Sequence, residues 1–281
     1  MASGNKNNYL IFASCLTILF LLIFLYAPTF KWMYGRFTAT DTYYSHGFLI
    51  PFVTGFLIWQ KRDALRKTQE EYSWIGVILI LLGLCAHLAS MVLYVFFSSG
   101  FSLFLVILGL SLFLFGKKVT GTIFFPLMFL LFMFPLPMGV INKIAYPMKM
   151  NVASGGSNMV NLMGFSVYQT GFFIETTGGV LLIDNPCSGL RSLIAFLAMG
   201  SLLAYLTKTS TINKLLIAAA SVIVALVTNI VRVVFLLLVA SFYGVEKASP
   251  GSFPHDASGY AIFLVGGSIL FLLARIFEWN E

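Results

Sequence analysis

The sequence predicts an all-α integral membrane protein with about eight transmembrane helices. The chain of 281 residues is 59% hydrophobic and only 10% charged, and its mean hydropathy is +0.93. A water-soluble fold of this length cannot bury so much apolar surface. The apolar runs, each near the ~20 residues needed to cross a bilayer, are separated by short charged or turn-rich breaks. Little chain remains for a soluble domain, so we expect a single polytopic membrane domain over residues 1–281.

The first half of the chain contains five predicted helices, which are bounded by charged pairs and aromatic loops. The first helix follows Lys6, and no small-x-small cleavage pattern comes after it, so we expect a retained helix and not a signal peptide. From the hydrophobic pattern the five helices cover about 9–27, 47–60, 74–94, 101–116 and 119–135.

The segment 136–186 breaks the pattern of spanning helices. Ala145–Met163 is amphipathic and rich in Met, with an expected break at Gly155-Gly156. Two short apolar stretches within 172–184 flank Gly178-Gly179, a pattern typical of a β-hairpin. We therefore expect a small amphipathic and β-hairpin segment between the fifth and sixth helices, which forms an extracytoplasmic lid or platform.

Three more helices are expected at about 187–206, 215–243 and 258–275, with the loop Gly244–Ser258 between the last two. Most Lys and Arg residues fall on one side if both termini are cytoplasmic, which favours that orientation. The basic residues stand in pairs at the ends of apolar runs, so the net charge of +7 reflects topology. We expect the lipid bilayer as a partner and no nucleic acid.

A polar stretch before the sixth predicted helix carries the most reactive side chain. Of the three cysteines, only Cys187 has polar neighbours. If Asn185 caps the helix and Pro186 takes its first position, Cys187 lies in the first turn, where the helix dipole favours a thiolate. Arg191 then shares its face. If Ser188 is the cap instead, Cys187 stands just before the helix.

The second candidate is Arg232, which lies well inside the seventh predicted helix, about 16 Å below Tyr243 at ~1.5 Å per residue. A guanidinium facing lipid is costly, so Arg232 must face the bundle interior or a wet cavity. Thr228 and Asn229 share its helix face and extend a polar stripe. A structural arginine that satisfies backbone carbonyls would show the same pattern.

The third candidate is His255, in the outer loop between the last two helices, on the same predicted side as Cys187. A Cys, a His and an Arg that converge in one site can carry out acyl transfer at a cysteine. His46 lies on that side too and is a supporting candidate. His87 falls within a helix and no metal-ligand spacing occurs, so we expect no metal and no cofactor.

Four motifs in this order resemble the exosortase/archaeosortase family. They are Tyr-Ser-His-Gly-Phe-Leu-Ile-Pro from Tyr44, Cys-Ser-Gly-Leu-Arg-Ser-Leu from Cys187, Asn-Ile-Val-Arg-Val from Asn229, and His-Asp-Ala-Ser-Gly from His255. They extend over most of the chain, from residue 44 to residue 259. Each motif is weak alone, and the set is specific.

The resemblance implies a multi-pass cysteine protease and transpeptidase of a prokaryotic cell membrane, with its active site on the extracytoplasmic side. Its substrates would be membrane-anchored exported proteins with a C-terminal sorting signal, which consists of a Pro-Glu-Pro-like motif, a transmembrane helix and a basic tail. The family's catalytic Cys, Arg and His correspond to Cys187, Arg232 and His255. Arg191, Asn229 and His46 are supporting candidates.

Two other functions remain open from the residues. A transporter or channel would use Arg232, Asn229 and Thr228 as an intramembrane anion site, and its function would survive Cys187→Ser. A scaffold for surface-polymer export would use the motifs for packing alone, so that no single one of the three catalytic candidates would be essential.

Overall fold

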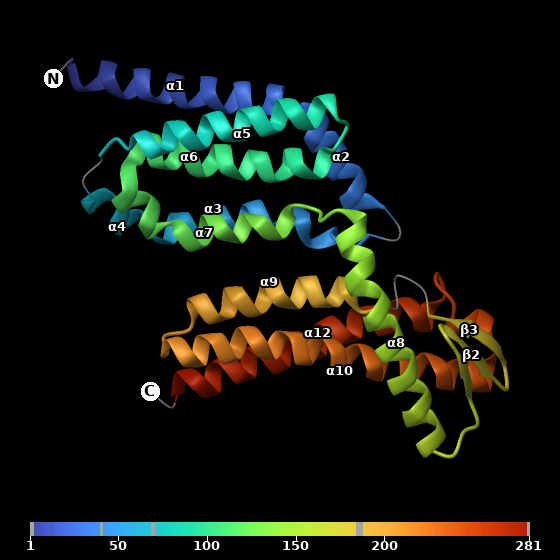
Figure 1. Cartoon of the computed structure of the whole chain (residues 1–281). Coiled ribbons are helices and arrows are strands. Elements are labelled where there is room, and N and C mark those ends of the chain that lie inside the picture. The colour runs from blue at the N-terminus through green and yellow to red at the C-terminus, as the bar shows by residue number, and fades with distance from the viewer. Residues whose placement is uncertain (1–2, 40–41, 69–70, 184–187, 280–281) are drawn as a thin grey trace. The chain divides into compact units, whose positions relative to one another are not determined.

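The computed structural model describes residues 3–39, 42–68, 71–183 and 188–279 (Figure 1). The chain divides into two compact units. Unit 1 consists of Met1–Thr38 and Phe48–Pro135, and unit 2 consists of Ala39–Gly47 and Leu136–Glu281. The expectation of one membrane domain over the whole chain stays a prediction.

Unit 1 is built from helices, of which α5 and α6 form a long antiparallel hairpin (Figure 1). A bend of 68° separates α1 from α2. The elements are α1 (Ser3–Leu25), α2 (Ala27–Thr38), α3 (Leu49–Gln60), α4 (Arg62–Lys67), α5 (Trp74–Val92), α6 (Phe96–Thr122), α7 (Phe124–Phe129) and the 3-10 helix η2 (Leu130–Met133).

Glycines allow α5 and α6 to pack closely. A Cβ atom at Gly76 would lie 2.4 Å from the backbone nitrogen of Phe113, and one at Gly109 would lie 2.8 Å from the carbonyl oxygen of Gly76. Such close backbone approach is typical of membrane helix pairs with small residues at the contact. The break expected before Lys117 is a kink at Gly116, whose φ is +78°, and α6 continues beyond it.

A buried polar network lies beside this hairpin in unit 1. The Nδ1 atom of His87 is 2.8 Å from the Ser99 hydroxyl, which is 2.6 Å from the Thr29 hydroxyl. The Tyr26 hydroxyl is 3.0 Å from that of Ser102, and its ring centroid lies 4.1 Å from that of His87. Tyr26 stands at the bend between α1 and α2, so the network ties the bend to α5 and α6.

Unit 2 packs α9 (Leu190–Leu206), α10 (Thr211–Tyr243) and α12 (Phe253–Trp279) against one another, with α8 (Met138–Leu162) on α10 (Figure 1). The expected break at Gly155-Gly156 is wrong, because α8 continues through both glycines. A Cβ atom at Gly156 would lie 2.8 Å from the Val233 side chain of α10. These glycines therefore bring α8 close to α10 without ending the helix.

The expected hairpin is confirmed as β2 (Phe173–Thr176) and β3 (Gly179–Leu182), and β1 (Tyr168–Thr170) adds a third strand that the sequence did not predict. The sheet is antiparallel with the order β1-β2-β3, and Ile174 pairs with Leu181. These two side chains are buried against α8, α10 and the short helix α11 (Val245–Ala248). The turn between β2 and β3 is fixed to α10, because the Thr177 hydroxyl donates to the Ser241 carbonyl at 3.0 Å.

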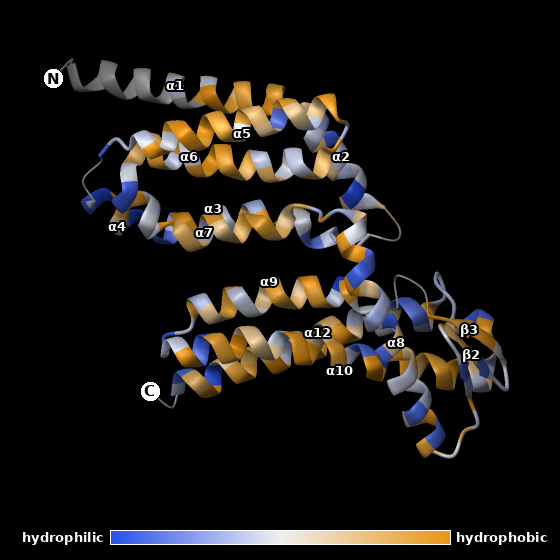
Figure 2. Ribbon diagram, in the orientation of Figure 1, coloured by the Kyte–Doolittle hydropathy of each residue, from blue (hydrophilic) through white to orange (hydrophobic). Residues whose placement is uncertain are grey.

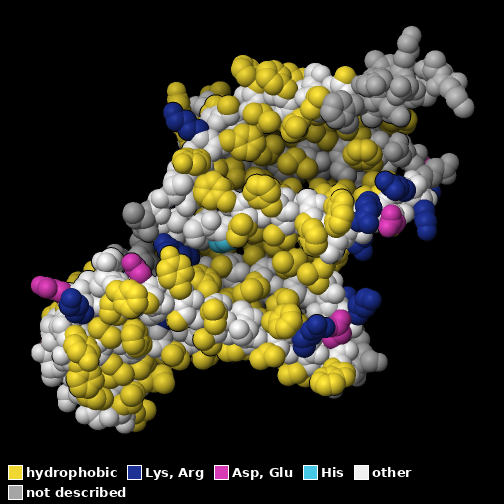
Figure 3. Space-filling model, turned by 180° about the vertical axis from the view of Figure 1, so that it is seen from behind, with side chains coloured by type: hydrophobic (Ala, Val, Ile, Leu, Met, Phe, Trp, Pro, Cys, Tyr) yellow, Lys and Arg dark blue, Asp and Glu magenta, His cyan; other side chains and the backbone are white. Residues whose placement is uncertain are grey.

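Hydrophobic residues make up most of the long helices (Figure 2), and hydrophobic side chains are spread over the face seen in Figure 3. Among the described residues, four helices are long and apolar enough to cross a membrane, or six if each bent helix pair is one span. The chain is thus a multi-pass membrane protein, while the expected count of about eight is not confirmed. The difference arises because helices such as α3, with 12 residues, and α9, with 17 residues, are short.

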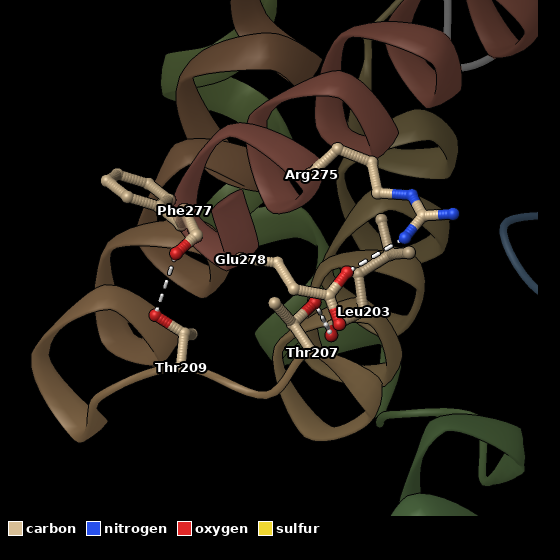
Figure 4. Close-up of polar contacts among 6 residues, drawn as sticks. All are labelled: Leu203, Thr207, Thr209, Arg275, Phe277 and Glu278. Atoms are coloured by element: carbon tan, nitrogen blue, oxygen red, sulfur yellow. Dashed lines mark hydrogen bonds and ion pairs between the residues drawn. The ribbon is translucent and has the colours of Figure 1, made fainter. Parts of the chain in front are cut away.

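One hydrogen bond joins the α9–α10 loop of unit 2 to the end of α12, and two further polar contacts lie within the ends of α9 and α12 (Figure 4). The Thr209 hydroxyl donates to the Phe277 carbonyl at 3.2 Å, and Thr207 donates to the Leu203 carbonyl at 2.7 Å. Arg275 forms an ion pair with Glu278 at 2.9 Å. The start of α9, the end of α10 and the start of α12 all lie at the opposite end of these antiparallel helices (Figure 1).

Candidate active site

The helix after the predicted nucleophile begins at Leu190, with Gly189 as its N-terminal cap residue. Cys187 itself, with residues 184–186, lies outside the described residues. The expectation that Asn185 caps this helix is wrong, because the helix begins at Leu190. The alternative cap, Ser188, lies one residue before the observed cap residue Gly189. The buried Ser188 hydroxyl accepts a bond from the backbone N–H of Leu190 at 3.3 Å.

Gly189, two residues after Cys187, rests directly on the polar face of α10. A Cβ atom at Gly189 would lie 2.8 Å from Nδ2 and 2.9 Å from Cγ of Asn229. The φ angle of Gly189 is +79°, in the left-handed region that glycine adopts readily. Both the backbone angle and the contact with Asn229 therefore require glycine here. Gly189 therefore contacts α10 about one helical turn from Arg232.

The predicted polar stripe on α10 is confirmed, because Thr228, Asn229 and Arg232 are all buried. Arg232 donates from Nε to the Ser258 hydroxyl at 3.2 Å and from Nη2 to the His255 carbonyl at 3.3 Å. Ser258 donates to the same carbonyl at 2.7 Å. Arg232 therefore binds the first turns of α12, and its bond to a main-chain carbonyl is one that the alternative of a structural arginine expected.

His255 lies in the first turn of α12 and not in a loop, so that part of the prediction is wrong. The helix starts earlier than expected because Ser252 acts as its cap, and its hydroxyl accepts from the backbone N–H of His255 at 3.4 Å. The His255 ring is buried, and its Nδ1 atom lies 3.1 Å from the carbonyl oxygen of Ala248 in α11. A carbonyl only accepts, so Nδ1 carries the proton and Nε2 is the basic nitrogen of the neutral ring.

Arg191 reaches this group of residues from α9. Its charge and that of Arg232 both act on the His255 ring. The Nε atom of Arg191 donates to the Thr42 carbonyl at 2.5 Å, which brings the segment Ala39–Gly47 to the start of α9.

His46, the remaining supporting candidate, is half-buried in this segment, and its ring centroid lies 6.0 Å from that of Tyr44. The Tyr44 hydroxyl accepts from the backbone N–H of Leu136 at 3.0 Å, just before α8. The structure therefore groups Arg191, Asn229, Arg232 and His255, and it places His46 on the neighbouring segment.

Sequence reasoning missed Ser258 and the Ala248 carbonyl. Ser258 lies three residues after His255, so helical spacing could have indicated it. The Ala248 carbonyl left no signal, because every residue supplies one and only the fold selects which carbonyl meets the ring.

A hollow of about 490 Å³ lies between α10 and α12 beside Arg232. Apolar side chains line most of it, including Val231 and Phe235 of α10 and Ala261 of α12, while Arg232 and Ser258 supply polar atoms. The guanidinium of Arg232 can therefore bind a polar group in an apolar surrounding, and the neighbouring His255 ring, with its fixed tautomer, can move a proton. Among the described residues, no group of three or more His, Cys, Asp or Glu side chains could hold a metal ion.

Comparison with known proteins gives one family. The family model described as transmembrane exosortase matches residues 32–272, which cover all the site residues described above. No curated protein and no solved structure matched the chain.

Proposed function

The chain belongs to the transmembrane exosortase family, and on this premise we propose that it is a membrane-embedded cysteine protease and transpeptidase that cleaves C-terminal sorting signals. The observation that carries the proposal is the grouping of Arg232, His255 and the chain next to Cys187 at one end of unit 2. A histidine with one fixed proton and an arginine beside a cysteine segment suit acyl transfer.

In the proposed reaction, His255 Nε2 takes the thiol proton of Cys187, and the sulfur attacks the scissile carbonyl carbon. The new C–S bond forms a tetrahedral intermediate, and the C–N bond then breaks. Nε2 gives the proton to the leaving amine, so the acyl group remains on sulfur as a thioester. The bond from Nδ1 to the Ala248 carbonyl supports this role, because it holds the ring in the tautomer that exposes a basic Nε2.

Arg232 has two proposed roles. It holds His255 through the main-chain carbonyl and Ser258, and its positive charge stabilises the oxyanion or pairs with an acidic group of the substrate. A guanidinium buried at 8% exposure interacts strongly with a nearby anion, because little water screens it.

The proposed substrates are membrane-anchored proteins with a Pro-Glu-Pro-like motif, a transmembrane helix and a basic tail. Both termini would be cytoplasmic and the site extracytoplasmic, so that the substrate helix enters sideways from the bilayer and presents its motif to the site. An amine acceptor would resolve the thioester by transpeptidation and water by hydrolysis.

The test is processing of a co-expressed reporter that ends in such a motif, helix and tail. We expect loss of processing in Cys187→Ala, Arg232→Ala and His255→Ala. Cys85→Ala and Arg275→Ala are matched controls, because Cys85 is an exposed thiol on α5 and Arg275 is an exposed arginine at the far end of α12. Continued processing by Cys187→Ala would refute the proposal, and mass spectrometry of the product's new C-terminus identifies the acceptor.

A further inference from the structure

The outer edge of strand β3 offers unused backbone hydrogen-bonding groups. Ile183 donates to the Phe172 carbonyl at 2.9 Å, so Gly179, Leu181 and Ile183 exchange bonds with β2 in this antiparallel register. The N–H and C=O groups of the alternate residues, Val180 and Leu182, then point away from β2. Within the described part of the chain, these groups have no hydrogen-bond partner.

This edge lacks two features that commonly protect an exposed strand, namely charged side chains and proline. Charged side chains, prolines and bulges commonly prevent an edge from pairing with other chains. Residues 179–183 read Gly-Val-Leu-Leu-Ile, with no charge and no proline. Val180 is 51% exposed and Leu182 is 46% exposed, and both side chains lie on the sheet face away from the core.

The other face of β3 is firmly anchored next to the candidate site. Leu181 and Ile183 are buried in the same hydrophobic cluster as Ala248, whose carbonyl holds the His255 ring. Leu182 precedes Cys187 by five residues, so Cys187 lies at most about 18 Å from it along an extended chain. A segment paired with β3 would therefore lie within reach of the proposed nucleophile.

We propose that β3 binds the substrate as an added strand, so that the extended peptide beside the scissile bond pairs with the backbone of Val180 and Leu182. This inference rests on the proposed function and adds its mode of recognition. Main-chain hydrogen bonds to an edge strand supply affinity for an extended peptide, and alternate side chains supply specificity. Here the alternate substrate side chains would contact the apolar outer face formed by Phe173, Val180 and Leu182.

The first test compares Leu182→Pro with Leu182→Ala in the reporter assay. Both variants lose the leucine side chain, while only proline removes the outward N–H. The matched control is Gln169→Pro. Gln169 is the outward-pointing residue of β1, at the opposite edge of the same sheet, and proline is tolerated on edge strands.

We expect Leu182→Pro to lower kcat/KM by on the order of tenfold relative to Leu182→Ala, as the loss of one hydrogen bond would. Gln169→Pro should process the reporter as wild type does. Equal rates for Leu182→Pro and Leu182→Ala would overturn the inference, and so would an equal loss in Gln169→Pro.

The second test measures binding and not turnover. It does not use the proline variant, so it remains decisive if Leu182→Pro folds poorly. Cys15→Ser, Cys85→Ser and Cys187→Ala together remove the native cysteines, so that Leu182→Cys introduces a single thiol. This protein is oxidised in the presence of reporters that each carry one cysteine at a successive position near the motif. Strand pairing predicts disulfides at every second position, and Gln169→Cys should give none. A disulfide between two copies of Leu182→Cys would assign the edge to self-association and overturn the inference.

Failure of the inference and failure of the proposed function give different results. If the wild-type protein does not process the reporter, the proposed function fails. If it does, and the Leu182 variants show neither the rate difference nor the alternating disulfides, only the strand-pairing inference fails.

Discussion

Gly189→Ala is expected to damage the site through two separable effects. The first is the left-handed backbone, with φ at +79°, which costs a residue with a Cβ atom about 1–2 kcal/mol. The second is steric: the new methyl group would lie 2.8 Å from Nδ2, 2.9 Å from Cγ and 3.2 Å from Cβ of Asn229. Overpacking of this kind costs about 1–3 kcal/mol, so the contact is expected to contribute at least as much as the backbone.

Gly164→Ala separates the two effects. Gly164 also has a left-handed φ, at +89°, but no atom lies within 4 Å of a Cβ built there. It should therefore show the backbone penalty alone. If displacement of the chain next to Cys187 slows the reaction, Gly189→Ala should process the reporter about 5- to 150-fold more slowly than Gly164→Ala, which is the rate equivalent of 1–3 kcal/mol.

The assay is the initial rate of reporter processing by purified protein, together with thermal unfolding in detergent. Shortening the opposing side chain should relieve the clash, so Asn229→Ala combined with Gly189→Ala should lose less than the sum of the single losses. The reasoning is refuted if Gly189→Ala and Gly164→Ala behave alike in both measurements, or if the double variant is strictly additive.

Four further predictions follow from the same contacts. Arg232→Lys keeps the charge but cannot reproduce the paired bonds to Ser258 and the His255 carbonyl, so the rate of reporter processing should fall at least tenfold. Ser258→Ala removes only one partner of Arg232 and should lower that rate less. His87→Leu should lower the unfolding free energy by about 1–3 kcal/mol, because it leaves the buried Ser99 hydroxyl with one partner fewer; unchanged thermal unfolding would contradict this. Gly116→Ala should prevent stable folding of unit 1, because its Cβ atom would lie 1.8 Å from the Glu71 carbonyl oxygen, and loss of monodisperse protein in detergent is the measurement. A reporter with proline at the central position of its motif should be processed more slowly than one with alanine there if that residue's N–H pairs with β3, and equal rates would contradict pairing at that residue.

The sequence predicted those parts of the fold that depend on local patterns. The hairpin around Gly178-Gly179 follows from a turn pair between two apolar stretches, and it is confirmed. The buried stripe of Thr228, Asn229 and Arg232 follows from helical spacing and the cost of exposing a charge to lipid. Both are confirmed because the local pattern and the tertiary environment favour the same structure.

The errors arose where tertiary contacts decide the local structure. Gly155 and Gly156 suggested a break, but in α8 they serve the close approach to α10. The start of α12 at Phe253 depends on the Ser252 cap, which placed His255 on a helix and not in a loop. The partners of Arg232 and His255 are largely main-chain carbonyls, and a sequence does not reveal which carbonyl a side chain will meet.

Helix α10 supports each part of the proposed catalytic machinery through a separate contact. Ser241 holds the turn that leads into β3, Asn229 holds Gly189 beside the cysteine segment, and Arg232 holds the start of α12. Residues 229 and 241 are about 18 Å apart along the helix axis. The β2–β3 turn, Gly189 and the start of α12 therefore all depend on buried contacts along a single helix. We therefore expect Arg232 to act on the proposed reaction through the position of α12 as well as through its charge.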